Sequence, residues 1–221
     1  MSKLSKRLNE IYYLVSGGTI ADVGCDHGKL ASALVESKKC LFAYVSDISK
    51  PSLEKAEKLL SGHDNFRAIH CDGLQGYVGS NVDECIISGM GGEEIIQIIS
   101  SSPIDIPVYI LSPQKNEVKV KEYMSSIGYG IVFDKIIKDK GKFYHIFRCE
   151  KGAKTNAQDE LDLYFGRDSF EAGDTDFIEY LDYESNKTNN ILDRVDSQKK
   201  EELIKYLDLL KLAKKRNGKK L

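Results

Sequence analysis

Ile20-Ala21-Asp22-Val23-Gly24-Cys25-Asp26-His27-Gly28 is the stretch that decides the fold of this chain. A short apolar strand runs into an acidic turn with a glycine at each end, and a helical pattern begins directly after it. Strand, glycine turn and helix in this order are typical of the first βα unit of a nucleotide-type site. There the backbone approaches a ligand so closely that only glycine avoids a Cβ clash. The stretch therefore predicts a ligand site at the start of an α/β domain.

The acid within the turn indicates which ligand the site takes. A dinucleotide fingerprint needs G-x-G-x-x-G, so that bare backbone amides meet a pyrophosphate. Asp26 occupies the second glycine position in this chain, and its carboxylate would repel a pyrophosphate. S-adenosylmethionine has no phosphate and carries a sulfonium cation, which neighbouring acids favour. The turn therefore predicts a methyl-donor site.

Length and composition limit the classes of protein to which this chain can belong. The chain has 221 residues and 41% hydrophobic content, enough for one α/β core with a small appendage. Its net charge of −2 excludes a globally basic nucleic-acid binder, so a nucleic-acid partner must meet a local patch. The cysteines are scattered and the histidines lack ligand spacing, and no apolar run reaches the roughly 18 residues of a membrane span. We expect a soluble cytoplasmic protein that holds no metal and contacts no membrane.

The order of elements predicts the fold. After an amphipathic helix over 4–15, the pattern predicts strands near 19–23, 41–46, 66–70, 82–88 and 107–111. Between them it predicts helices near 29–37, 49–61, 91–100 and 115–126. This alternation is typical of a parallel, doubly wound sheet. Residues 131–133 and 143–147 flank a polar turn and predict an antiparallel hairpin that closes the sheet.

The composition changes after Glu150. Residues 151–156 are expected to form a polar linker, and only helical signals follow, near 159–166, 174–196 and 200–216. The two longer helices are expected to pack as an antiparallel hairpin of coiled-coil type. We therefore expect a Rossmann-like class I methyltransferase domain over residues 1–153 and a C-terminal helical, coiled-coil domain over residues 154–221.

Acids recur where strands end. Asp47 closes the second strand, where an acid hydrogen-bonds ribose hydroxyls in this fold class, and Asp72 follows the third and is expected to accept from an adenine amine. Any single Asp at such a place can instead cap a helix or a turn. Together with Gly24 and Asp26, their register with successive strands favours one ligand site.

A glycine-rich loop, Ser88-Gly89-Met90-Gly91-Gly92, follows the fourth strand at the expected substrate edge. Enzymes that methylate exocyclic base amines usually carry an acid or Asn, two prolines and an aromatic residue here, and this chain has neither the prolines nor the aromatic residue. The glycines are expected to let the backbone approach both the cofactor and a flat substrate. A flexible turn is the alternative interpretation.

The chain resembles the TrmK family of tRNA methyltransferases, which methylate N1 of the adenosine at position 22 of tRNA. The resemblance covers nearly the whole chain, and its specific part joins the Asp-His after the glycine turn to Gly-Met-Gly-Gly. The similar motifs are Leu4-Ser5-Lys6-Arg7-Leu8, Ala21-Asp22-Val23-Gly24-Cys25-Asp26-His27, Gly89-Met90-Gly91-Gly92, Gly141-Lys142-Phe143-Tyr144 and Phe165-Gly166.

The chain also departs from the family pattern. Lys29 stands where the family usually has an aromatic residue, and Leu111-Ser112-Pro113-Gln114 replaces its usual Leu-Gln-Pro-Asn. Lys121 replaces a customary Arg. These changes leave the expected cofactor contacts intact and affect the expected contacts to the target base.

The resemblance implies S-adenosylmethionine as cofactor, tRNA as partner and a catalytic role for Asp26, which would accept from the N6 amine of the target adenine. His27 is the second catalytic candidate, either orienting Asp26 or touching the base; a helix-start histidine bonded to backbone is the alternative. The expected cofactor-binding residues are Asp22, Gly24, Asp26, His27, Asp47, Ile48, Cys71, Asp72, Gly73, Ser88, Gly89 and Met90.

Phosphates of tRNA are expected to meet Lys3, Lys6, Arg7, Lys29 and the basic end of the chain from Lys211. A solvated charged face is the alternative for each of them, and the last few residues are expected to be disordered rather than to bind. The helical hairpin can clasp tRNA by shape or mediate dimerisation; we expect a monomer. Two other functions stay open from the sequence. One is a methyltransferase of the same fold that acts on a small molecule or a protein. The other is a non-catalytic RNA- or partner-binding module that keeps a vestigial cofactor site.

Overall fold

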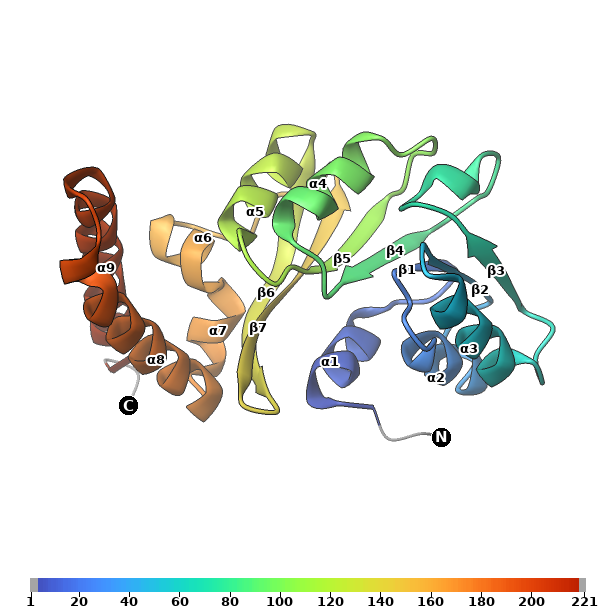
Figure 1. Cartoon of the computed structure of the whole chain (residues 1–221), viewed down its shortest axis with the longest axis horizontal. Coiled ribbons are helices and arrows are strands. Elements are labelled where there is room, and N and C mark those ends of the chain that lie inside the picture. The colour runs from blue at the N-terminus through green and yellow to red at the C-terminus, as the bar shows by residue number, and fades with distance from the viewer. Residues whose placement is uncertain (1–3, 219–221) are drawn as a thin grey trace.

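A seven-stranded mixed sheet forms the frame of residues 4–218, the part of the chain that the computed structural model describes (Figure 1). The strand order is β3-β2-β1-β4-β5-β7-β6, with β1 to β5 parallel and β7 antiparallel to both neighbours. The strands are β1 (Thr19–Val23), β2 (Phe42–Asp47), β3 (Phe66–His70), β4 (Glu84–Ser88), β5 (Val108–Ser112), β6 (Tyr129–Asp139) and β7 (Lys142–Lys151). The predicted parallel sheet with a closing hairpin is confirmed.

The closing hairpin is longer than the sequence indicated. Its strands extend beyond the apolar segments 131–133 and 143–147, because polar residues alternate with buried ones along both strands. In β6, for example, Lys138 is half-buried and Ile137 beside it is fully buried. A search for apolar runs therefore finds only the first half of each strand.

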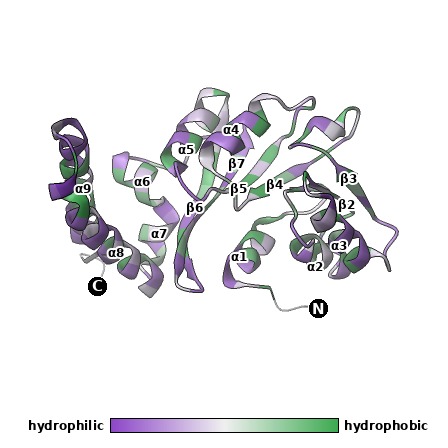
Figure 2. Ribbon diagram, viewed as in Figure 1, coloured by the Kyte–Doolittle hydropathy of each residue, from purple (hydrophilic) through white to green (hydrophobic). Residues whose placement is uncertain are grey.

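Helices cover both faces of the sheet (Figure 1). One face carries α1 (Lys6–Leu14), α2 (Lys29–Glu36) and α3 (Lys50–Leu60), and the other carries α4 (Gly92–Ser100) and α5 (Glu117–Ser126). Ser49 begins α3 as the predicted N-cap, since its hydroxyl accepts from the Ser52 amide at 3.4 Å. The central strands are largely hydrophobic, whereas the helices show stretches of both kinds (Figure 2), as expected of elements with one face in the core.

Four helices follow the sheet and lie beyond β6 at its edge (Figure 1). They are α6 (Glu160–Phe165), α7 (Arg167–Ala172), α8 (Thr175–Ile191) and α9 (Ser197–Gly218). The sequence missed α7, whose six residues include only one large apolar side chain, Phe170, and so show no apolar periodicity. The long helices α8 and α9 pack on one another as a hairpin, and Phe177, Leu181 and Leu210 contribute to their shared core.

The helical part is bonded to the edge of the sheet. Three alternate amides of β6, at Asp134, Ile136 and Lys138, donate to side chains of the helical part: Asp168 (2.8 Å) and Ser169 (2.8 Å) of α7 and Asp176 (2.7 Å) of α8. These bonds satisfy donors that an edge strand otherwise leaves open.

The expected polar linker also lies against this strand. The Asn156 amide donates to the Ile131 carbonyl oxygen at 2.8 Å, and the Ile131 amide donates to the Thr155 hydroxyl at 3.1 Å. The segment 151–156 is therefore fixed along β6 and does not tether the helices loosely.

One buried ion pair joins the sheet to both groups of helices. The Lys121 ammonium of α5 lies 2.5 Å from the Asp134 carboxylate of β6 and donates to the Leu163 carbonyl oxygen of α6 at 2.8 Å. Both charged side chains are almost completely buried. Burial outweighs the neighbouring ammonium and raises the pKa of Asp134 to about 6.

We predict that Lys121→Met lowers the free energy of unfolding by about 3–5 kcal/mol, because it leaves Asp134 buried without its partner. Urea unfolding near neutral pH measures the change, and Lys121→Met with Asp134→Leu should recover part of the loss. Lys119→Met is the control on the same helix, since Lys119 is 60% exposed and its pair with Glu93 is screened by solvent. Equal losses for the two single variants would contradict the role of the buried pair.

Candidate functional site

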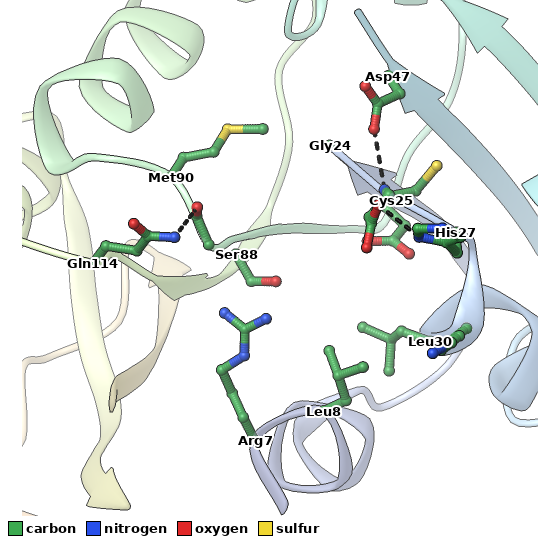
Figure 3. Close-up of a pocket in the computed structure, with 14 residues that line it drawn as sticks. Arg7, Leu8, Gly24, Cys25, His27, Leu30, Asp47, Ser88, Met90 and Gln114 are labelled. Atoms are coloured by element: carbon green, nitrogen blue, oxygen red, sulfur yellow. Dashed lines mark hydrogen bonds and ion pairs between the residues drawn. The ribbon is translucent and has the colours of Figure 1, made fainter. Parts of the chain in front are cut away.

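A cavity of about 350 Å³ opens at the carboxyl ends of the central strands (Figure 3). It lies at β1 and β4, where the strand order reverses and where open α/β sheets bind their ligands. The lining residues are Arg7, Leu8, Asp22, Gly24, Cys25, Asp26, His27, Lys29, Leu30, Asp47, Ser88, Gly89, Met90 and Gln114. The structure thus brings together the acidic turn, the end of β2 and the glycine-rich loop, as predicted from their register.

Gly24 forms a bare cradle in the floor of this cavity. Its φ of +68° is a left-handed conformation that side chains disfavour, and a Cβ built there would lie 2.1 Å from the Met90 methyl carbon. Met90 therefore packs directly over the turn after β1. The glycine at position 24 makes room for the Met90 side chain, and its backbone lines the cavity.

Asp47 holds the acidic turn in shape. One of its carboxylate oxygens accepts from the Asp26 amide at 3.0 Å, and the other accepts from the Ser49 amide at 2.8 Å. Asp26 itself has a φ of +50°, a left-handed conformation that Asp and Asn tolerate better than most residues. The end of β2 thus fixes the conformation of the turn after β1.

Asp26 and His27 form one chain of polar contacts with Lys55. The Nδ1 atom of His27 lies 2.7 Å from an Asp26 carboxylate oxygen, and its Nε2 atom lies 3.1 Å from the Lys55 ammonium. Because an ammonium only donates, Nε2 accepts and Nδ1 carries the proton given to Asp26. Of the roles considered for His27, this geometry favours orienting Asp26, whose side chain is 74% exposed.

Asp22 lies at the base of the same cavity and is buried. Burial raises its pKa to about 7, an effect that a hydrogen bond from the Ala31 backbone opposes and the nearby Asp47 carboxylate reinforces. The cavity therefore contains three carboxyl groups, Asp22, Asp26 and Asp47, opposite two cations, Arg7 and Lys29.

The three glycines of the loop after β4 have two different roles, one in lining the cavity and the other in packing. Gly89 lines the cavity, and its carbonyl oxygen accepts from the Gln114 side-chain amide at 2.5 Å. Gly92 instead lies under the next loop, where an added Cβ would be 2.7 Å from the Lys115 carbonyl oxygen. Gly91 likewise faces the Lys115 side chain. The sequence analysis expected the whole loop to approach a ligand. Only Gly89 is placed to do so, whereas Gly91 and Gly92 make room for the loop that contains Lys115.

The basic residues expected to meet phosphates lie in different places. Arg7 points into the cavity (Figure 3), and its guanidinium lies 4.8 Å from the centre of the Tyr144 ring. Lys29 lines the same cavity. Lys6 instead pairs with Asp176 of α8 at 2.5 Å. Lys3 lies outside the described residues.

The basic end of the chain is partly neutralised within the helical part. Lys211 pairs with Asp208, Lys214 pairs with Asp182, and Arg216 pairs with Asp159 and Asp162. Lys219 and Lys220 lie outside the described residues. These pairs make α9 a weaker electrostatic surface than its sequence indicated.

Some of the predicted cofactor residues line a second cavity of about 500 Å³. Ile48, Asp72 and Gly73 line it together with Gln97. Asp47 lines the first cavity and Ile48 the second, so the two cavities meet at the end of β2. The Cys71 thiol is turned toward the Gly73 carbonyl oxygen, to which it donates at 3.3 Å.

Sequence reasoning missed Leu30 and Lys55 as parts of the site, and it considered Gln114 only as a departure from the family pattern. Gln114 follows β5, so the rule that ligands bind where parallel strands end could have found it. Lys55 belongs to α3, and nothing in its sequence context distinguishes it from other exposed helical lysines. Within residues 4–218, no group of three His, Cys, Asp or Glu side chains is placed to hold a metal, and no helix has the length and apolar character of a membrane span.

Comparisons with known proteins agree with this geometry. Residues 20–215 match the family described as TrmK: tRNA (adenine(22)-N(1))-methyltransferase. A putative tRNA methyltransferase of Mycoplasma pneumoniae is 32% identical over 132 residues, which make up 59% of this chain and 62% of that protein. The chain thus spans somewhat less than two thirds of that relative. The tRNA (adenine(22)-N(1))-methyltransferase of Bacillus subtilis is 28% identical over 171 residues, 74% of this chain and 72% of that protein.

A solved structure is similar over nearly the whole fold. It is M. capricolum TrmK in complex with S-adenosyl-homocysteine, described as the natural cofactor product. The two structures share a TM-score of 0.83 and 25% sequence identity, over 94% of this chain and 96% of that chain. The helical part beyond β6 must therefore be included in the similarity.

We predict that Asp22 makes stability depend on pH. Its pKa is raised from 3.8 to about 7 by folding, so the native state binds more protons than the unfolded chain between these values. The parent should therefore lose stability relative to Asp22→Asn as pH rises from about 4 to 7, by up to about 4 kcal/mol. Chemical unfolding across this range measures the difference. For Glu57→Gln, an exposed change on α3, the difference in unfolding free energy from the parent should not depend on pH. If the difference between the parent and Asp22→Asn is also independent of pH, the raised pKa of Asp22 is refuted.

Proposed function

This chain belongs to the TrmK family of tRNA (adenine(22)-N(1))-methyltransferases, and on that premise we propose that it methylates N1 of adenosine 22 in tRNA with S-adenosylmethionine. The observation that carries the proposal is the cavity at the switch point of the sheet, with its bare Gly24 and the ordered acid Asp26. Gly24 and Asp26 both belong to the motif in which the sequence resembles the family signature.

The two cavities support a binding mode for the methyl donor. Its methionine half would lie over Gly24 and its adenosine half toward Asp72, with Asp47 between them accepting from the ribose hydroxyls. The carboxylates of Asp22 and Asp26 favour the positive sulfur. Arg7 offers the charge that an anionic group needs, either the carboxylate of the donor or a phosphate of the target nucleotide. When bound, the donor supplies an electrophilic methyl carbon.

The chain's own residues must position the base and balance its new charge. Adenine N1 attacks through a lone pair, so the site needs no base to deprotonate it. N1 lies on the Watson–Crick edge, and the target must therefore leave its base pair. Asp26 can accept from the N6 amine and stabilise the positive charge that develops on the purine. His27 and Lys55 hold the Asp26 carboxylate in place before the base arrives.

The outline of the site favours a macromolecular substrate over a small one. Every residue that lines the first cavity lies between Arg7 and Gln114, and the described residues of α6 to α9 contribute none of them. The helical part therefore does not close over this cavity as a lid. We propose that residues 1–153 carry methyl transfer and residues 154–221 help to bind tRNA, and that the protein acts as a cytoplasmic monomer.

We predict that Asp26→Asn lowers the rate of methyl transfer by about 10²–10⁴, because it keeps the shape of the turn but removes the charge. Single-turnover assays on unmodified tRNA, run beside donor-binding measurements, separate chemistry from binding. Donor affinity should change much less than the rate. Asp105→Asn is a matched control, since Asp105 is 72% exposed and lies in neither cavity. Transfer at the parent rate would make Asp26 a structural turn residue only.

We predict that Asp47→Ala weakens donor binding by about 1–3 kcal/mol, because it removes an acceptor for the ribose and frees the Asp26 amide. Calorimetry with S-adenosyl-homocysteine measures the affinity, and circular dichroism checks that the variant is folded. Unchanged affinity in a folded variant would reject the assignment of Asp47.

A further inference from the structure

A second groove lies beside the candidate active site, on the side of the helical part. It has a volume of about 370 Å³ and is bounded by the loop after β5, the turn between β6 and β7, and α8. Gln114 lines this groove and also the first cavity, so the two are adjacent. Figure 1 shows the β6–β7 turn beside the start of α8. The groove is thus the place where the sheet and the helical part meet next to the site.

Aromatic rings form one wall of the groove. Phe143 of β7 and Tyr183 of α8 lie with ring centres 5.4 Å apart at an angle of 42°. Phe143 is half-buried and also packs edge-on against Tyr180, which is buried. Tyr183 remains 52% exposed. A large aromatic side chain held this open, backed by a second ring, offers a flat surface on which another ring can stack.

Lysines surround these rings. Lys115, Lys142 and Lys187 line the groove and are exposed, and Lys187 lies 5.7 Å from the centre of the Tyr183 ring. Two acids also face the groove: Glu184, which pairs with Lys187 at 2.8 Å, and Glu117, which lies 3.7 Å from the buried His145.

Two of the lysines keep their charge available. Among the described residues, Lys115 and Lys142 have no ion-pair partner. Lys115 lies in the loop that carries Gln114, and Lys142 begins β7 directly after the left-handed Gly141 of the hairpin turn. The loop after β5 and the start of β7 thus place both lysines at the groove beside the aromatic wall.

We propose that this groove binds a nucleotide next to the target adenosine, with its base stacked on Tyr183 and Phe143 and its phosphate against Lys115 or Lys142. The proposal rests on the proposed function. Exposing N1 of the target breaks its stacking as well as its pairing, so a neighbouring base loses a stacking partner. Aromatic side chains replace such a partner without regard to sequence, and lysines hold the backbone. The Gly141-Lys142-Phe143 turn has no role in the first cavity. In this proposal it holds the neighbouring nucleotide.

The decisive variant is Tyr183→Ala. Loss of one base–aromatic stack should raise the Kd for unmodified tRNA roughly 5- to 100-fold, with donor affinity within about twofold of the parent. Tyr183→Phe keeps the ring and should bind tRNA like the parent. Tyr13→Ala removes a tyrosine that is 67% exposed on α1 and lines neither the groove nor the first cavity, and it should have no effect. Parent-like tRNA affinity of a folded Tyr183→Ala protein would overturn the proposal.

Salt dependence tests the phosphate contact separately. Lys142→Gln should reduce the slope of log affinity against log salt by about one unit, and Lys39→Gln, a change at a half-buried lysine beside Tyr13, should leave it unchanged. An unchanged slope for Lys142→Gln would show that Lys142 does not contact a phosphate.

These readouts are tRNA affinities and need no methyl transfer. A parent protein that binds tRNA through Tyr183 but does not methylate it would refute the proposed reaction and leave the groove supported. A Tyr183→Ala protein that binds and methylates tRNA like the parent would refute the groove alone.

Discussion

The carboxylate of Asp47 accepts backbone hydrogen bonds from Asp26 and Ser49, and so ties the turn after β1 to the start of α3. The left-handed conformation of Asp26 persists because this acceptor holds its amide. Once the turn is fixed, the Asp26 carboxylate faces the cavity, and His27 can reach it from one side while contacting Lys55 on the other. One carboxylate at the end of β2 therefore sets both the expected ribose contact and the orientation of the expected catalytic acid.

The helical part depends on a different constraint, the open edge of β6. Side chains of α7 and α8 accept from its alternate amides, and Ile136 enters the core that these helices share with α9. The buried Lys121 adds a contact between the sheet and α6. Removing the helices would expose both this apolar core and the polar edge, so the two proposed domains are expected to stabilise one another. The same docking places α8 beside the β6–β7 turn and thereby creates the second groove.

The sequence predicted features that follow from local patterns or from strand order. The parallel strands, the cap at Ser49 and the gathering of Gly24, Asp26 and Asp47 are of this kind, since strand ends in one sheet meet at one edge. It missed features that depend on side chains from distant segments. A single large apolar side chain, Phe170, is too little pattern to reveal α7, and no local signal pairs Lys6 with Asp176 or turns Arg7 into the cavity. Burial of Lys121 also contradicts what its residue type alone suggests.

An exposed carboxylate is a weak source of binding energy in water, and Asp26 is 74% exposed. Asp26 contributes to the proposed reaction only when a purine covers its carboxylate. The base excludes water, and the lower local dielectric strengthens the interaction between the carboxylate and the charge developing on the ring. Because the His27 Nδ1–H already holds the carboxylate, little reorganisation is needed at that moment. The contribution of Asp26 therefore depends on how firmly the base is seated. That dependence couples chemistry in the first cavity to any contact, such as stacking in the second groove, that keeps the tRNA strand unstacked.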